Sequence, residues 1–187
     1  MIFVTVGNMD PFDRLIKAMD HWAGQQASPV EILAQIGTGT YRPENLQYVD
    51  FLTPAEYKQK FGQADLVVSH AGMGSIITAL EAYKPMVIMP KLASLGEQRN
   101  EHQMATAKRF KRSALIQVAY DVDELYEKLA EAATSDEAKV ALQRQAWPPD
   151  ASLIDFIRGF VTSVPAPTST SRVDLPPKGI SVSDGNS

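Results

Sequence analysis

Short runs of apolar residues alternate along this chain with stretches in which apolar positions recur every three or four residues. The apolar runs predict strands, and the three-to-four spacing predicts amphipathic helices between them. Strands are expected at 2–6, 30–37, 48–52, 64–70, 85–90 and 114–118, and helical stripes at 12–22, 73–83, 98–110, 122–129 and 153–161. Another helix is expected to begin at Thr53 and Pro54, which have the residue types of an N-cap and a first helical position. Continuous apolar strands that alternate with helices indicate an α/β fold, a Rossmann-like parallel sheet with helices on both faces.

The composition of the chain changes near residue 163. The segment 164–187 is rich in Pro, Ser and Thr and shows no periodicity. Such a segment cannot bury enough apolar surface to offset the entropy lost on ordering. We therefore expect one Rossmann-like domain over 1–163 and a disordered tail over 164–187.

Composition and charge narrow the class of protein. Of the 187 residues, 44% are hydrophobic and 21% are charged, which is typical of a soluble globular domain. The net charge of -4 disfavours a nucleic-acid binder. The chain has no cysteine, and its three histidines are far apart, so neither a disulfide nor a zinc signature is present and no metal or cofactor is expected. The opening apolar run is too short for a signal peptide, which predicts a cytoplasmic location.

The stretch HAGMGS (70–75) is the clearest candidate binding loop. Ligands of open parallel sheets bind beyond the carboxyl ends of the strands, and this stretch joins such an end to a helix. Gly72 and Gly74 allow a ligand to approach the backbone, Ser75 has the type of a helix cap with a free hydroxyl, and a helix N-terminus favours an anion such as a diphosphate. Glycines that only permit close helix–strand packing explain the loop equally well. His70 is a candidate catalytic residue, although an isolated His here more often packs or caps.

A second polar cluster, GEQRNEHQ (96–103), lies at the expected start of the helix over 98–110. Carboxylate, amide and imidazole groups suit hydrogen bonds to sugar hydroxyls, which both donate and accept. Acidic residues are also favoured at any solvated helix N-terminus, so this stretch alone does not establish a site.

In combination these stretches resemble the C-terminal domain of glycosyltransferase family 28, the donor-binding half of a GT-B enzyme. The resemblance covers about residues 1 to 130 and rests on IFVTVGNMDPFDRLI, ADLVVSHAGMGSIITALEAYKPMVIMP and GEQRNEHQ, in that order. Within the family the chain is similar to the small catalytic subunits of two-part transferases. The insertion KLASLGEQR is more similar to the bacterial exopolysaccharide branch than to the eukaryotic dolichol branch.

The resemblance implies a role for each matching residue. Diphosphate contacts fall on Gly72, Met73, Gly74 and Ser75, donor-sugar contacts on Glu97, Asn100, His102 and Gln103, and the uracil border on Phe51 and Leu52. Gly7 and Asn8 match a loop that faces the cleft between the two halves of the enzyme. Thr78 stands where many GT-B enzymes have a Glu that binds ribose, which puts ribose recognition in doubt. Lys91 or Arg99 could pair with the carboxylate of a donor glucuronate, although each is equally typical of a solvent-exposed residue.

The implied function is that of a catalytic, donor-binding subunit. It would move a sugar from a UDP-sugar to a polyprenyl-diphosphate-linked saccharide, with inversion and without a bound metal. A separate membrane-attached subunit would bind the acceptor, supply the general base and hold this chain at the inner face of the membrane. The alternative is a non-catalytic nucleotide-binding or scaffolding subunit that retains the fold, which the missing ribose Glu favours.

Overall fold

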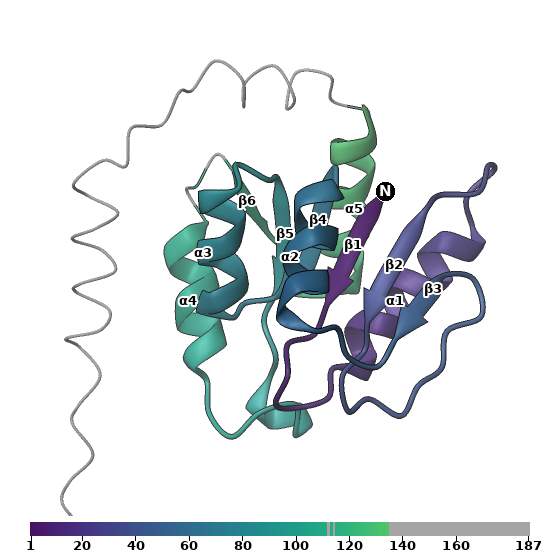
Figure 1. The fold of residues 1–187 in the computed structure, drawn as a ribbon. Helices are drawn as coiled ribbons and strands as arrows, with labels where there is room; N and C mark the ends of the chain where they lie inside the picture. The colour runs from purple at the N-terminus through teal and green to yellow at the C-terminus, as the bar shows by residue number, and fades with distance from the viewer. Residues whose placement is uncertain (112, 114, 135–187) are drawn as a thin grey trace, which may run out of the picture. The chain divides into compact units, whose positions relative to one another are not determined.

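The computed structural model describes residues 1–111, 113 and 115–134 of the chain. These residues form a six-stranded sheet of order β3-β2-β1-β4-β5-β6, in which every neighbouring pair is parallel (Figure 1). The strands are β1 (Ile2–Thr5), β2 (Ile32–Gln35), β3 (Gln47–Val49), β4 (Leu66–His70), β5 (Met86–Met89) and β6 (Ile116–Val118). The predicted α/β fold with a parallel sheet is confirmed.

The helices lie between the strands in the chain. They are α1 (Asp13–Gly24), α2 (Pro54–Gln63), α3 (Met73–Glu81), α4 (His102–Phe110) and α5 (Val122–Thr134), with a short 3-10 turn η1 (Ala93–Leu95) before α4. Several predicted bounds were wrong, and the second strand, expected over 30–37, spans only Ile32–Gln35. The third strand ends at Val49 instead of residue 52, and the helix expected from residue 98 begins at His102 because the preceding residues fold into a loop. The predicted helix over 153–161 and the predicted domain boundary at 163 lie outside the described residues.

Helices cover both faces of the sheet. On one face, buried side chains of β1, β2, β4 and β5 form a single core with α1 and α5. On the other face, Phe3 of β1 packs edge-on against Tyr57 and Phe61 of α2, with ring centroids 5.6 and 6.1 Å apart. Because helices cover both faces, a ligand can approach the strands from the loops at their ends.

Two sets of hydrogen bonds fix the positions of the loops around α2 and between β2 and β3. A capping box starts α2: the Thr53 hydroxyl accepts from the Glu56 N–H at 3.3 Å, and the Glu56 carboxylate accepts from the Thr53 N–H at 2.8 Å. The predicted start at Thr53 and Pro54 is confirmed. Buried Asp20 of α1 accepts from the Tyr41 hydroxyl at 2.7 Å and from the Asn45 N–H at 2.6 Å, which fastens the β2–β3 connection to α1.

Candidate functional site

The loops after β1 and β4 lie side by side at the centre of the sheet, where the chain stops adding strands on one side of β1 and begins adding them on the other. From β1 the chain proceeds outward through β2 to β3, and it then returns to the other side of β1 to add β4, β5 and β6. The carboxyl end of this β1–β4 boundary is the position at which open α/β sheets bind ligands. It holds Gly7 and Asn8 after β1 and the HAGMGS loop after β4, so the structure brings two of the predicted sets of site residues together.

The imidazole of His70 lies between Gly7 and Gly72. A Cβ at Gly7 would lie 2.8 Å from His70 Cε1, and a Cβ at Gly72 would overlap His70 Nε2. Gly7 also has a φ of 80°, a conformation that favours glycine. Close packing on His70 therefore explains both of these glycines. Gly74 differs, because a Cβ there would have nothing within 4 Å.

His70 is largely buried beneath these glycines. Burial, together with the nearby charge of Lys91, lowers the pKa of His70 to about 4. Its Nδ1 lies 3.1 Å from the Ser69 hydroxyl. An imidazole with this pKa is neutral at neutral pH and is a poor general base there, because an efficient base has a pKa near the working pH.

The first turn of α3 lies within the HAGMGS stretch and presents backbone donors. Gly72 is the N-cap of this helix, so the prediction that Ser75 caps it was wrong. The Ser75 side chain is buried instead, and its hydroxyl lies 3.2 Å from the Tyr57 hydroxyl. The first N–H groups of a helix have no acceptor within the helix, and here they belong to Met73, Gly74 and Ser75. Gly74 is exposed and adds no side chain above them.

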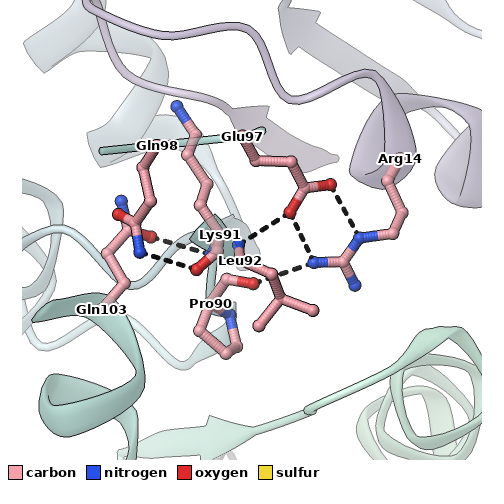
Figure 2. Close-up of polar contacts among 7 residues, drawn as sticks. All are labelled: Arg14, Pro90, Lys91, Leu92, Glu97, Gln98 and Gln103. Carbon is pink, nitrogen blue, oxygen red and sulfur yellow. Dashed lines mark hydrogen bonds and ion pairs between the residues drawn. The ribbon is translucent and has the colours of Figure 1, made fainter. Parts of the chain in front are cut away.

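The loop after β5 is fastened by an ion pair from α1 (Figure 2). Arg14 donates to both carboxylate oxygens of Glu97 at 2.8 Å and to the Pro90 carbonyl at 2.9 Å. Glu97 also accepts from the Leu92 N–H at 2.9 Å. Both oxygens of Glu97 are thus engaged within the protein. The structure gives Glu97 a role in shaping the loop, which its sequence neighbours do not reveal because Arg14 is 83 positions away.

The predicted sugar contacts at the start of α4 fall into two groups. Asn100 and His102 are exposed, and the Asn100 side chain accepts from the His102 N–H at 3.2 Å. Gln103 is half-buried and points inward, where its Oε1 accepts from the backbone N–H groups of Ala71 and Lys91, each at 3.1 Å. Gln103 therefore lies against the HAGMGS loop, as a shared site requires.

Lys91 is buried, with 3% of its surface exposed. Its ammonium donates to the Val6 carbonyl at 3.0 Å and to the Asp10 carbonyl at 2.5 Å, and burial lowers its pKa. The hypothesis that Lys91 contacts a sugar carboxylate was therefore wrong, because its ammonium donates to carbonyls of the loop after β1. The sequence shows a lysine directly after a predicted buried strand. This position indicates burial but does not reveal that the ammonium bonds to the Val6 and Asp10 carbonyls.

The nucleoside residues lie on the loop after β3. Phe51 is exposed, and Leu52 is half-buried. Buried Gln35 connects this loop to the first one, because its Nε2 donates to Asn8 at 3.2 Å and its Oε1 accepts from the Leu52 N–H at 3.2 Å. Sequence reasoning missed this link. Thr78 lies one turn into α3, and its hydroxyl donates to the Gly74 carbonyl at 2.9 Å.

The surface between α1 and α5 forms an open hollow of about 460 Å³, lined by Arg14, Lys17, Ala18, Val122 and Tyr126. None of the predicted site residues lines it, so the candidate site rests on loop chemistry and topology. Within the described residues, no group of three or more His, Asp or Glu side chains is placed to hold a metal ion. In the same part of the chain, no helix has the length and apolar character needed to cross a bilayer.

Comparisons with known proteins relate this chain to a known family and fold. The sequence pattern of the glycosyltransferase family 28 C-terminal domain matches residues 1–153. UDP-N-acetylglucosamine transferase subunit ALG13 of Eremothecium gossypii is 35% identical over 121 residues, which are 64% of this chain and 57% of that protein. The Homo sapiens protein of the same name is 34% identical over 120 residues, or 58% of this chain and 10% of its own length. The chain thus spans only part of each of these relatives.

Among solved structures, MurG of Acinetobacter baumannii has the same fold. The TM-score is 0.55 at 19% identity, and the match covers 84% of this chain and 49% of the MurG chain. At this identity the likeness concerns the fold alone. The expected correspondence to one half of a GT-B glycosyltransferase is confirmed.

Proposed function

Because this chain belongs to the family of glycosyltransferase family 28 C-terminal domains, we propose that it is the catalytic, donor-binding subunit of a UDP-sugar-dependent glycosyltransferase. One observation carries the proposal. The first N–H groups of α3 lie at the β1–β4 boundary, beside Gly74. Gly74 has no side chain, and a Cβ added there would meet no other atom within 4 Å. This arrangement suits a diphosphate, whose charge is favoured by the helix dipole.

In this proposal the helix terminus stabilises the departing UDP. The N–H groups of Met73, Gly74 and Ser75 hold the diphosphate, and the charge that develops on the leaving oxygen meets donors that are already in place. Inversion, and a reaction without a bound metal, follow from the family resemblance and belong to the proposal.

The remaining donor contacts lie on neighbouring loops. Exposed Phe51 and the adjacent Leu52 border the uracil, and Thr78 lies near the ribose. Asn100, His102 and Gln103 form the sugar end. Glu97 holds the loop through Arg14 and Leu92, and its carboxylate, which has about four lone-pair sites, keeps the capacity to accept from a sugar hydroxyl.

The proposed acceptor is a polyprenyl-diphosphate-linked saccharide, bound by a separate membrane-attached subunit. The word "subunit" in the names of the two relatives supports a partner. The low pKa of His70 supports a general base on that partner, because this buried imidazole is a poor base at neutral pH. The partner would hold this chain at the inner membrane face, in the assembly of an exopolysaccharide or another lipid-linked glycan.

A thermal-shift panel tests the donor class. UDP-GlcNAc comes first, since the relatives are named for that sugar, followed by UDP-glucuronate, UDP-glucose and UDP-galactose. A ligand that binds the native state raises the unfolding midpoint. We expect a rise with UDP and a larger rise with one of the UDP-sugars. No rise with UDP or any of the four would contradict the proposal.

A non-catalytic nucleotide-binding or scaffolding subunit is the second candidate. The observation that favours it is Thr78, whose hydroxyl bonds to the Gly74 carbonyl and which replaces the ribose-binding Glu of many GT-B enzymes. Transfer assays with the reconstituted partner separate the two functions. UDP binding without transfer in the reconstituted pair would favour the scaffold.

A further inference from the structure

The side-chain carbonyl of Gln103 joins two backbone segments that follow neighbouring strands. Its Oε1 accepts from the Ala71 N–H, in the loop after β4, and from the Lys91 N–H, two residues after the end of β5 (Figure 2 shows the contact with Lys91). An amide oxygen has two lone pairs, so these two donors use its acceptor capacity. The contact links α4 to the ends of both strands.

These two bonds also determine which end of the amide faces inward. The oxygen and nitrogen of a glutamine amide are told apart by their hydrogen-bond partners, and two N–H donors require the oxygen. The –NH₂ group, with its two donors, is left for the other side. A ligand that met this end of the amide would find two donors and no acceptor.

Ala71 is 1% exposed and immediately precedes Gly72, the N-cap of α3. A buried N–H that loses its acceptor is costly, so the loop would shift if the Gln103 carbonyl were removed. Any such shift would move the first turn of α3, which begins at Met73.

Beyond the sugar contact that belongs to the proposed function, we propose that Gln103 is a positioning residue, which holds the start of α3 in register with the end of β5. The positioning role rests on the two bonds to Oε1, whereas its effect on UDP binding rests on the proposed function. The consequence is specific: loss of Gln103 weakens UDP binding as well as sugar transfer, because the diphosphate loop loses its support.

Three variants separate the two roles. Gln103→Glu keeps an acceptor oxygen for both N–H groups and replaces the outward donors by an oxygen. Gln103→Ala removes the acceptor and the donors together. Gln59→Ala is the matched control, because Gln59 is an exposed glutamine on α2.

Amide hydrogen exchange of the ligand-free protein tests the positioning role. In Gln103→Ala, the Ala71 and Lys91 amides should exchange roughly tenfold faster or more, because each has lost a bonded acceptor. In Gln103→Glu and Gln59→Ala, exchange at both amides should remain close to that of the wild type. Unchanged exchange in Gln103→Ala would overturn the positioning role.

UDP affinity and transfer with the reconstituted partner test the outward amide. Gln103→Ala should lose several-fold in UDP affinity and more in transfer. In Gln103→Glu, transfer should fall roughly tenfold more than UDP affinity, which corresponds to one lost hydrogen bond to the sugar. Wild-type transfer by Gln103→Glu would overturn the sugar contact, and wild-type UDP affinity in Gln103→Ala would overturn the link to the diphosphate loop. If the wild type itself bound no UDP, the proposed function would fail while the exchange data still decided the positioning role.

Discussion

At the scale of single residues, the imidazole of His70 makes stability depend on pH. Its pKa falls from an ordinary 6.5 to about 4 on folding, so between these values the unfolded chain binds more protons than the folded one. The contribution of His70 to the free energy of unfolding is fully present above pH 6.5. It decreases as the pH falls, and about 3 kcal/mol has been lost by pH 4. We expect urea unfolding to show that the free energy of unfolding of the wild type falls between pH 6.5 and pH 4. In His70→Asn, this fall should be smaller by about 3 kcal/mol. Equal pH dependence in the two proteins would contradict the buried, neutral imidazole.

The sequence predicted the positions of the site residues better than their partners. HAGMGS was placed correctly because a strand, a small-residue loop and a helix are encoded locally. The roles of Gly72 and Gly74 were not separable, since only the position of the His70 ring distinguishes them. Glu97 and Gln103 have the types of solvated residues, and their buried engagements depend on Arg14 and Ala71, which are distant in sequence.

At the scale of elements, Lys91 fastens the loop after β1 to the end of β5. Its buried ammonium donates to the Val6 and Asp10 carbonyls and lies 5.7 Å from the centroid of the Phe12 ring. Lys91→Met retains the aliphatic chain but leaves these carbonyls without the ammonium, so we expect it to lower the free energy of unfolding by about 1–3 kcal/mol. Chemical denaturation measures this loss.

Lys58→Met is the control for that change, because Lys58 is exposed on α2 and should alter stability by less than about 0.5 kcal/mol. Lys91→Met with wild-type stability would show that the ammonium does not secure the loop.

Element boundaries were predictable where their signals are local. Thr53, Pro54 and Glu56 start α2 through contacts within one turn, and the sequence predicted this start. The start of α4 was placed too early. The residues before His102 form a loop that is held by Arg14 from α1, and no local pattern reports such a tertiary contact.

At the scale of the whole molecule, the proposed partner needs a surface near the candidate site. The loops after β1 and β5 are joined by Lys91 and carry two exposed apolar side chains, Met9 at 84% and Leu95 at 59%. We expect this chain to bind UDP alone but to transfer sugar only with its partner. Leu95→Asp should lower transfer by the reconstituted pair roughly tenfold or more, as truncation of a central interface residue does, and should leave UDP affinity unchanged.

Tyr83→Asp is the matched control for Leu95→Asp. Tyr83 is also an exposed large side chain, but it follows α3 and so lies at the opposite end of that helix from the HAGMGS loop. Transfer in the reconstituted pair should survive this change. Full turnover by the wild-type chain without any partner would refute the two-subunit account.

We propose that a UDP diphosphate binds the first turn of α3, and an NMR titration of the isotope-labelled chain with UDP would locate the bound nucleotide. We expect the largest amide shifts at Met73, Gly74 and Ser75, with smaller ones near Phe51. Gly74→Val should fold, because its Cβ meets nothing within 4 Å, yet should lose UDP affinity by roughly tenfold or more. Gly62→Val, at an equally open position on α2, should bind as the wild type does. Shifts confined to the hollow between α1 and α5, or undiminished binding by folded Gly74→Val, would show that the diphosphate does not bind at the start of α3.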